Sequence, residues 1–196
     1  MSDTDIDRAA AALRAGKLVV YPTETVYGLA ADATDPDAVE RVFDAKRRDR
    51  DKPVSVAVPS VTSLADLLTL TDREHRFASE FLPGPVTLVV NRGELPAVLT
   101  GGGERVGVRV PEQPLARQLL DRVAPITATS ANISGRESTR NVGDLDQEIR
   151  DAAAVVLDGG ETTGGEPSTV VDVERETIHR AGPLVDDIET WLDGSQ

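Results

Sequence analysis

Short apolar runs and amphipathic stretches follow one another along most of the chain. Runs of four or five residues that are rich in Val, Ile and Leu, and that end at Gly, Pro or polar residues, are typical of buried β-strands. The pattern predicts strands at Leu18–Tyr21, Val54–Val58, Val86–Val90, Val106–Val110, Ile126–Thr129, Ala154–Leu157, Thr169–Val173 and Thr177–Arg180.

Apolar residues spaced three or four positions apart predict helices between these strands. Gly16 follows the first of these helices as a stop signal. The helices are expected at Asp3 or Thr4 to Ala15, Pro36 to Lys46–Arg48, Ser63–Leu68, Asp72–Phe81, Pro114–Val123, Leu145–Ala153 and Leu184–Leu192.

Strands and helices do not alternate one to one. Two strands follow each other without a helix over 86–110 and again over 169–180. This order favours a twisted mixed sheet with helices over a doubly wound parallel sheet. The 196 residues contain no internal repeat and no linker, so we expect one α/β domain over residues 1–196.

The residue types that are rare or missing exclude several classes of protein. The chain has no Cys, which excludes disulfide scaffolds, thiolate metal sites, iron–sulfur clusters and Cys nucleophiles. His75 and His179 are its two His residues, too few for a His-rich metal centre. No apolar run approaches the ~18 residues of a membrane span, and the first residues are acidic. We therefore expect a soluble, cytoplasmic protein without a membrane partner.

The charge is strongly negative but unevenly distributed. With 34 acidic and 21 basic residues the net charge is −13, which argues against a general polyanion-binding surface. Lys occurs only at positions 17, 46 and 52, and the other basic residues are Arg. Such a composition is typical of proteins from salt-loving organisms, whose surfaces stay repulsive in high salt. The alternative is an ordinary acidic soluble protein.

The familiar phosphate-binding loops are missing. There is no G-x-x-x-x-G-K-[ST], and the glycines at 101–103 lead into Glu104 and Arg105, which breaks a G-x-G-x-x-G pattern. Any bound phosphate must therefore be held by side chains.

The densest polar group, YPTETVYGL at 21–29, follows the first predicted strand. If the segment stays extended, the hydroxyls of Thr23, Thr25 and Tyr27 project to one side beside Glu24. This arrangement suits a small ligand with ammonium and carboxylate ends. The alternative is a strand end whose Thr residues satisfy nearby backbone groups.

A second polar segment, AKRRDRDKP at 45–53, concentrates positive charge in an acidic chain. Clustered cations repel each other unless an anion meets them, so the segment suits phosphate or carboxylate. The alternative is a helix C-terminus, where cations favour the helix dipole and Asp49 and Asp51 neutralise their neighbours.

Three later segments also carry candidate chemistry. Ser130 and Asn132, at the end of a predicted strand, can present a hydroxyl and an amide in the same direction. A Gly-rich loop precedes Ser168 and the strand after it, and Arg180 precedes a turn. Ordinary turn chemistry is the alternative for each segment.

Taken together, these segments resemble the YrdC-like family of threonylcarbamoyl-AMP synthases, in order and spacing over nearly the whole chain. The length resembles the short form of the family, without the additional C-terminal domain of longer relatives. The matching motifs are YPTETVYGL at 21–29, AKRR…KP at 45–53, PGPVTLVV at 83–90, GVRVP at 107–111, TSANISG at 129–135, the Ser-Thr pair at 168–169 and RAGP at 180–183.

The resemblance implies a twisted mixed α/β sheet around a deep, positively lined concave site. It also implies a nucleotidyltransferase that makes L-threonylcarbamoyladenylate and pyrophosphate from L-threonine, bicarbonate or CO2, and ATP. The product would pass to other proteins that modify tRNA. Mg2+ is expected on the ATP phosphates, with no metal ligand from protein side chains.

Site residues carry over from the family position by position. The implied catalytic residues are Lys46, near the carboxylate or carbamate and the phosphate, and Arg48. The implied threonine contacts are Thr25, Arg109, Ser130 and Ser168. The implied ATP contacts are Arg48, Lys52, Arg105, Asn132, Arg140 and Arg180. Ala57 stands where some relatives carry His, and Arg105 and Arg140 stand where relatives often have small polar residues.

The resemblance implies little acid–base catalysis. The threonine amine attacks CO2 or bicarbonate, the carbamate oxygen attacks the α-phosphate, and catalysis comes from holding two anions in line. No Ser-His-Asp triad is evident. One rival is a double-stranded-RNA-binding module of the same fold, with weak binding of tRNA or duplex RNA expected at this net charge. Another is a hydrogenase-maturation carbamoyltransferase, which normally carries Cys-rich zinc modules. A third is a related branch of the fold without synthase activity.

Overall fold

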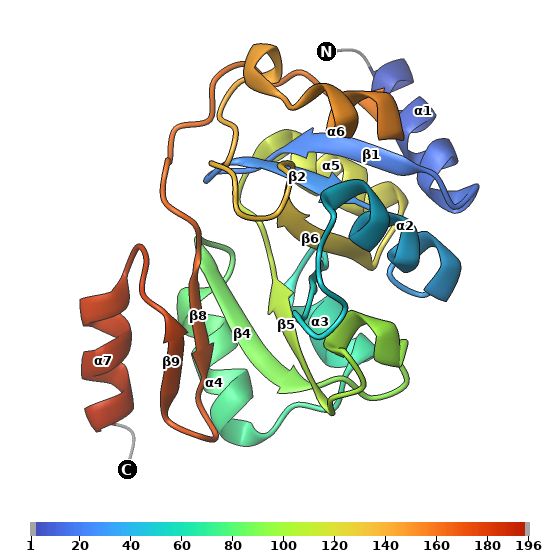
Figure 1. Cartoon of the computed structure of the whole chain (residues 1–196). Coiled ribbons are helices and arrows are strands. Elements are labelled where there is room, and N and C mark those ends of the chain that lie inside the picture. The colour runs from blue at the N-terminus through green and yellow to red at the C-terminus, as the bar shows by residue number, and fades with distance from the viewer. Residues whose placement is uncertain (1–2, 195–196) are drawn as a thin grey trace.

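A nine-stranded mixed sheet forms the centre of the molecule in the computed structural model, which describes residues 3–194 (Figure 1). The strand order is β7-β1-β2-β6-β3-β5-β4-β8-β9. In chain order the strands are β1 (Leu18–Pro22), β2 (Tyr27–Ala30), β3 (Ser55–Ala57), β4 (Val86–Asn91), β5 (Arg105–Arg109), β6 (Ile126–Ser130), β7 (Ala153–Val156), β8 (Thr169–Asp172) and β9 (Thr177–Arg180).

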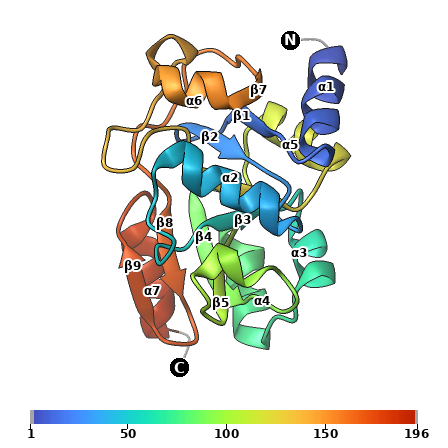
Figure 2. The ribbon, with the colours of Figure 1, turned by 45° about the vertical axis from the view of Figure 1, so that its right-hand side comes forward.

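Seven α-helices pack around this sheet (Figure 2). They are α1 (Asp3–Arg14), α2 (Pro36–Lys46), α3 (Val61–Leu67), α4 (Asp72–Phe81), α5 (Pro114–Arg122), α6 (Gln147–Ala152) and α7 (Val185–Gly194). Two short 3-10 helices, η1 (Ala97–Thr100) and η2 (Val142–Asp144), complete the structure. Within residues 3–194, no helix has the length and apolarity needed to cross a membrane.

The two faces of the sheet are covered differently. Helices α1 and α5 cover part of one face, where Leu13 and Leu119 pack against Val19 of β1 and Ala57 of β3. The other five helices cover the opposite face. There α2 and α6 pack on β1, β2 and β7, and α2, α3, α4 and α7 pack on β3, β4, β5 and β8. The first face is therefore only half covered, which leaves room for a site.

Most predicted elements are confirmed, with shifts of one or two residues at the ends of several. Helix α4 has the predicted bounds because Thr71 and Glu74 form a capping box, whose side chains each accept from the other's backbone N–H. Strand β2 was not predicted, since its four residues lie inside the polar motif at 21–29 and include a Gly. The 3-10 helices were also missed. The mixed sheet is confirmed: β1 pairs antiparallel with β2 and parallel with β7.

The expectation of an extended segment through 23–27 is wrong. Residues 23–26 form the turn of the β1–β2 hairpin, in which Pro22 pairs with Tyr27. The Thr23 hydroxyl stabilises this turn: it accepts from the N–H of Val26 at 3.3 Å and donates to the Val26 carbonyl at 2.6 Å. Hydroxyls of Thr23 and Thr25 still meet, 3.0 Å apart, but Tyr27 turns to the other face.

Candidate functional site

A cavity of about 560 Å³ lies over the half of the sheet face that α1 and α5 leave uncovered. Along the strands that form its floor, every second side chain points into the cavity. Thr87 and Val89 of β4 line the cavity, whereas the intervening Leu88 lies in the core. Arg109 of β5 lines the cavity beside Ala57, its strand partner. The cavity therefore lies on the face opposite α2, α3 and α4.

Glycine at two floor positions keeps the cavity open. A Cβ on Gly107 would lie 2.5 Å from the Ser55 Oγ and 2.7 Å from the Thr87 Cγ2. A Cβ on Gly28 would lie 2.7 Å from Cε1 of Tyr21. Because contacts this short do not occur, any larger residue would have to displace side chains that form the wall.

Positive charge dominates the wall of the cavity, as the resemblance implied. The lining includes one carboxylate, Asp172, and His179. It also includes the guanidinium groups of Arg48, Arg105, Arg109, Arg175 and Arg180. These arginines come from the end of α2, from β5 and from the β8–β9 hairpin, so the fold concentrates charges that are far apart in the sequence. In a chain of net charge −13 this recess is a local site for anions.

Arg48, Arg109 and Arg180 form the centre of this positive region. Burial, followed by the charges of Arg109 and Arg48, lowers the pKa of Arg180, so the three guanidinium groups act on one another. Protein oxygens hold all three in place, Arg109 through its ion pair with Glu24. Arg48 donates to the Pro53 carbonyl at 2.8 Å, and Arg180 donates to Ser168 Oγ at 3.0 Å. Fixed guanidinium groups suit bidentate binding of carboxylate or phosphate.

The predicted hydroxyl residues lie around the same region. Ser168 Oγ is 2.8 Å from the Thr87 hydroxyl, and Ser130 and Thr25 also line the cavity. Arg109 forms an ion pair with Glu24 of the hairpin turn, and both side chains are mostly buried. The structure thus brings together the predicted residues Thr25, Arg48, Arg105, Arg109, Ser130, Ser168 and Arg180.

Lys46 and Asn132 lie behind the wall. The Lys46 ammonium is buried, and it donates to the Ser130 carbonyl, to the Asn132 carbonyl at 2.7 Å and to Asn132 Oδ1 at 3.3 Å. Burial, and then the charge of Arg48, lowers the pKa of Lys46 to about 7. The Asn132 amide donates to the carbonyls of Ile133 and Arg136. The Ser130 hydroxyl donates to the Asn132 amide oxygen, so the hydroxyl and the amide lie together, with Ser130 at the cavity wall and Asn132 behind it.

The cation cluster at 45–53 does not form one anion site. Arg48 alone of the cations in this segment lines the cavity. Arg47 pairs with Glu148, Arg50 pairs with Glu40 at 2.9 Å and Asp44 at 2.6 Å, and the exposed Lys52 pairs with Asp49 at 2.9 Å. The Lys52–Asp49 pair agrees with the helix-end interpretation, whereas Arg47 and Arg50 are neutralised by acids that it did not name.

Arg140 is also outside the cavity wall. Its guanidinium donates to the Thr162 carbonyl at 3.0 Å and pairs with Glu161 at 2.9 Å. Those contacts hold the Gly-rich loop. The expected ATP contacts of Lys52, Asn132 and Arg140, and the expected substrate contact of Lys46, stay predictions.

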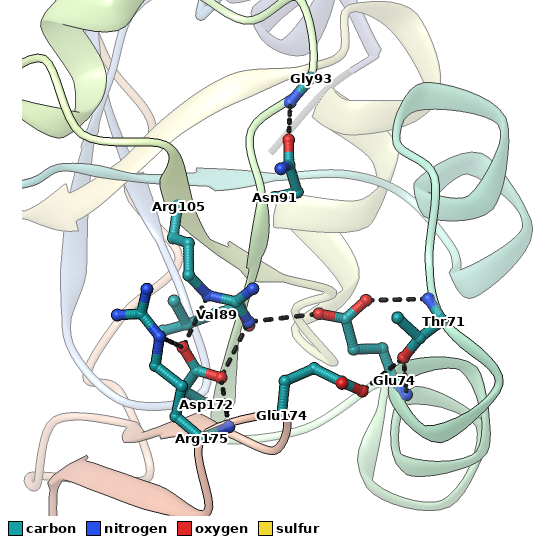
Figure 3. Close-up of polar contacts among 9 residues, drawn as sticks. All are labelled: Thr71, Glu74, Val89, Asn91, Gly93, Arg105, Asp172, Glu174 and Arg175. Carbon is teal, nitrogen blue, oxygen red and sulfur yellow. Dashed lines mark hydrogen bonds and ion pairs between the residues drawn. The ribbon is translucent and has the colours of Figure 1, made fainter.

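Arg105 lies at the far end of the cavity in a network of buried carboxylates (Figure 3). Its Nε is 2.6 Å from Oδ2 of Asp172, and its Nη2 is 3.3 Å from Oε1 of Glu74. Both carboxylates are almost fully buried, and Arg175 approaches Asp172 from the cavity side. Because two negative charges already meet Arg105, this end of the cavity attracts anions less than the centre does.

Sequence reasoning missed Asp172, Glu74, Arg175 and His179. Asp172 had a detectable signal: it is a carboxylate in an otherwise apolar predicted strand, at a position that shares a face with Ser168 and Val170. Glu74 lies inside the helix predicted at Asp72–Phe81, where the local pattern does not set it apart. Its contact with Arg105 joins positions 31 apart in the chain, which no local pattern reveals.

The fold and the site together define a class: an α/β protein with a glycine-floored, arginine-lined anion cavity on the open half of a mixed sheet. The chain belongs to the Sua5/YciO/YrdC family, since the family model described as "Telomere recombination" matches residues 11–182.

Several relatives have names and structures that bear on function. A threonylcarbamoyl-AMP synthase of Pyrococcus abyssi is 42% identical over 168 residues, which cover 84% of this chain and 49% of the relative. One of Photobacterium profundum is 30% identical over 184 residues, which cover 91% of this chain and 99% of the relative. The crystal structure of P. abyssi Sua5 complexed with L-threonine superposes with a TM-score of 0.92 at 38% identity, covering 99% of this chain and 58% of that one. The chain thus spans about half the length of the P. abyssi relative.

Proposed function

We propose that this chain is a threonylcarbamoyl-AMP synthase that joins L-threonine, bicarbonate or CO2, and ATP into L-threonylcarbamoyladenylate and pyrophosphate. The observation that carries the proposal is the group of Arg48, Arg109 and Arg180 in one cavity with Ser and Thr hydroxyls. Two substrates with carboxylate or phosphate groups need such a site, and a synthase must hold both at once. The names of the relatives and the threonine complex of P. abyssi Sua5 support this assignment.

The cavity offers each of the two substrates its own group of side chains. Arg109, with Thr25 and Ser168 beside it, suits the threonine carboxylate, because a guanidinium binds carboxylate in a bidentate manner. Arg48 and Arg180 suit the phosphates of ATP. In this arrangement Lys46 is a positioning residue: it holds the backbone of Ser130 and Asn132.

The reaction needs a cavity that orients reactants more than it needs an acid or a base. The threonine amine is the nucleophile for CO2 or bicarbonate, and an oxygen of the resulting carbamate attacks the α-phosphate as pyrophosphate leaves. Guanidinium groups fixed by protein carbonyls stabilise the charge that builds up on the phosphates without having to reorganise.

Mg2+ would enter this site on the phosphates of ATP, where it neutralises charge on the leaving pyrophosphate. In residues 3–194 no group of three or more His or acidic side chains could hold a metal ion. The carboxylate of the cavity wall, Asp172, is engaged by Arg105. The donor set of the wall therefore fits a metal brought by the nucleotide.

The proposed product would serve the threonylcarbamoyl modification of tRNA through proteins that accept it, in the cytoplasm. The comparisons give no support to the alternative, a double-stranded-RNA-binding module without synthase activity. The salt-loving lifestyle inferred from composition stays a prediction.

The test is an assay of pyrophosphate release from ATP with Mg2+ and bicarbonate, with threonine or serine added separately. Threonine-dependent release is expected, with serine much less effective. Release that does not depend on threonine, or no release in both low and high salt, would reject the synthase. Filter binding to duplex RNA over a range of salt concentrations tests the alternative, which predicts a steep salt dependence.

A further inference from the structure

Tyr21 is a buried tyrosine on the cavity wall that the proposed mechanism leaves without a role. It lies on β1, is 1% exposed and lines the cavity. Its cross-strand partner is Gly28 of β2, which in turn pairs with Ser130 of β6. The three positions form one row across the sheet, on the face that carries the cavity.

The missing side chain of Gly28 allows the Tyr21 ring to lie across this row. An ideal Cβ on Gly28 would be 2.7 Å from Cε1, 2.9 Å from Cζ and 3.3 Å from Oη of Tyr21. The hydroxyl end of the ring is therefore above Gly28, between β1 and Ser130. Both Gly28 and Ser130 line the cavity, so the hydroxyl lies at its wall.

The Tyr21 hydroxyl has no hydrogen-bond partner among residues 3–194, although the side chain is almost fully buried. Tyr27, at the other end of the same hairpin, is the opposite case. Its hydroxyl donates to the Gly160 carbonyl at 2.7 Å and accepts from the Gly159 N–H at 3.0 Å. A hydroxyl that no protein group engages at a cavity wall is free to bind a ligand there.

The charged groups around the Tyr21 hydroxyl indicate which kind of ligand it binds. Arg109 and Glu24 both act on Tyr21, and Arg109 favours an anion close by. Burial raises the pKa of Tyr21 to about 12, which keeps the phenol protonated and able to donate at neutral pH. A neutral O–H donor beside a guanidinium suits an oxyanion, because it adds a hydrogen bond without adding charge.

We propose that the Tyr21 hydroxyl donates a hydrogen bond to a carboxylate-type oxygen of the amino-acid substrate. That oxygen belongs either to the carboxylate of threonine or to the carboxylate formed on its amine. The inference rests on the function proposed above and adds to it a substrate-binding residue on β1.

Tyr21→Phe tests the proposal because it removes the hydroxyl and keeps the ring. One arm measures the affinity for threonine by calorimetry, without ATP or bicarbonate. The other measures pyrophosphate release against bicarbonate concentration at saturating threonine and ATP. A hydrogen bond to a charged group is worth roughly 1.5–3 kcal/mol, so we expect a loss of about 10-fold or more in one arm. Weaker threonine binding identifies the threonine carboxylate, and a higher bicarbonate requirement alone identifies the new carboxylate.

Gly28→Ala is the companion variant, since it keeps the hydroxyl and pushes the ring away from its place. The same arm should weaken, and the double variant should be no worse than the more affected single variant, because both changes remove one interaction. Tyr27→Phe is the matched control. It should lower the melting temperature through its lost protein contacts, whereas Tyr21→Phe should not.

Four results would overturn the proposal or separate it from the proposed function. If Tyr21→Phe leaves both arms within about twofold of wild type, the hydroxyl does not bind substrate. If Gly28→Ala weakens binding and Tyr21→Phe does not, the ring matters and the hydroxyl does not. If the wild-type protein binds threonine but releases no pyrophosphate, the proposed synthase function is rejected. Calorimetry on Tyr21→Phe then still tests whether the Tyr21 hydroxyl binds threonine. A wild-type protein that does neither overturns both.

Discussion

The Arg105 guanidinium reaches over β4 from β5 to Asp172 of β8, with 2.6 Å between Nε and Oδ2. On the way its Nη2 donates to the Val89 carbonyl of β4 at 2.7 Å. One side chain thus ties three neighbouring strands at the end of the cavity. It also meets Glu74 of α4, whose carboxylate belongs to the capping box of that helix.

Replacing Arg105 should destabilise the fold. Arg105→Met leaves the buried carboxylates of Asp172 and Glu74 without their cation, and breaking a buried pair in this way costs about 3 kcal/mol or more. Urea unfolding at fixed salt measures the change. The control is Arg8→Met, which breaks an exposed pair with Asp5 and should cost roughly 0–1 kcal/mol. Equal stability of the two variants would show that the network contributes nothing.

Arg48 should matter for turnover more than for stability. Arg48→Ala removes a guanidinium from the centre of the cavity, and losing one charge-stabilising donor lowers turnover by roughly 100-fold or more. Threonine-dependent pyrophosphate release measures the effect, and thermal unfolding confirms that the variant is folded. Arg50→Ala, which removes a nearby cation paired with Glu40 and Asp44, should keep wild-type activity. Full activity of Arg48→Ala with an unchanged melting curve would reject the role of Arg48.

Lys46 should make stability depend on pH in a defined direction. Burial lowers its pKa to about 7 in the folded protein, against 10.5 for an unperturbed lysine such as that of the unfolded chain. Between these values unfolding takes up a proton, so the free energy of unfolding should rise with pH, by up to ~1.4 kcal/mol per unit. Lys46→Met lacks this contribution, so its stability should rise less than that of wild type from pH 7 to 10. Parallel curves for the two proteins would contradict the shift.

Filling the cavity floor should weaken ligand binding. In Gly107→Ala the new Cβ would meet Ser55 Oγ at 2.5 Å and Thr87 Cγ2 at 2.7 Å, so wall side chains must move into the cavity. We expect weaker binding of threonine or ATP, measured by calorimetry, and a modest loss of stability of about 1–3 kcal/mol from overpacking. Gly143→Ala is the control, because nothing lies within 4 Å of its Cβ. Wild-type affinity in Gly107→Ala would show that ligands do not approach the floor.

The sequence predicted helices and strands well where the physical signal lies within a few neighbouring residues. The capping box at Thr71 gives α4 its observed bounds, and β9 has the predicted bounds Thr177–Arg180. The turn at 23–26 was misread because the Thr23 side chain can replace backbone hydrogen bonds, which favours a bend over an extended strand.

The site was predictable in its residue types and less so in its geometry. Arg48 and Lys46 are two positions apart, yet one faces the cavity and the other turns to the carbonyls after β6. The helix ends between them, at Arg47 in the left-handed region, so side chains on either side of it point apart. Contacts such as that of Arg105 with Asp172 depend on strand order, which the residue pattern does not contain.

The position of the β8–β9 hairpin near the end of the chain determines when the cavity is completed during synthesis. It supplies Arg175, His179 and Arg180 to the cavity wall, and β8 pairs with β4, a strand about 80 residues earlier in the chain. A nascent chain that has released everything up to Gly165 from the ribosome can already form β1 to β7. Its recess would still be open on one side and short of cationic groups. The ability to bind ligands would therefore arise late and in one step, when the β8–β9 hairpin pairs with β4.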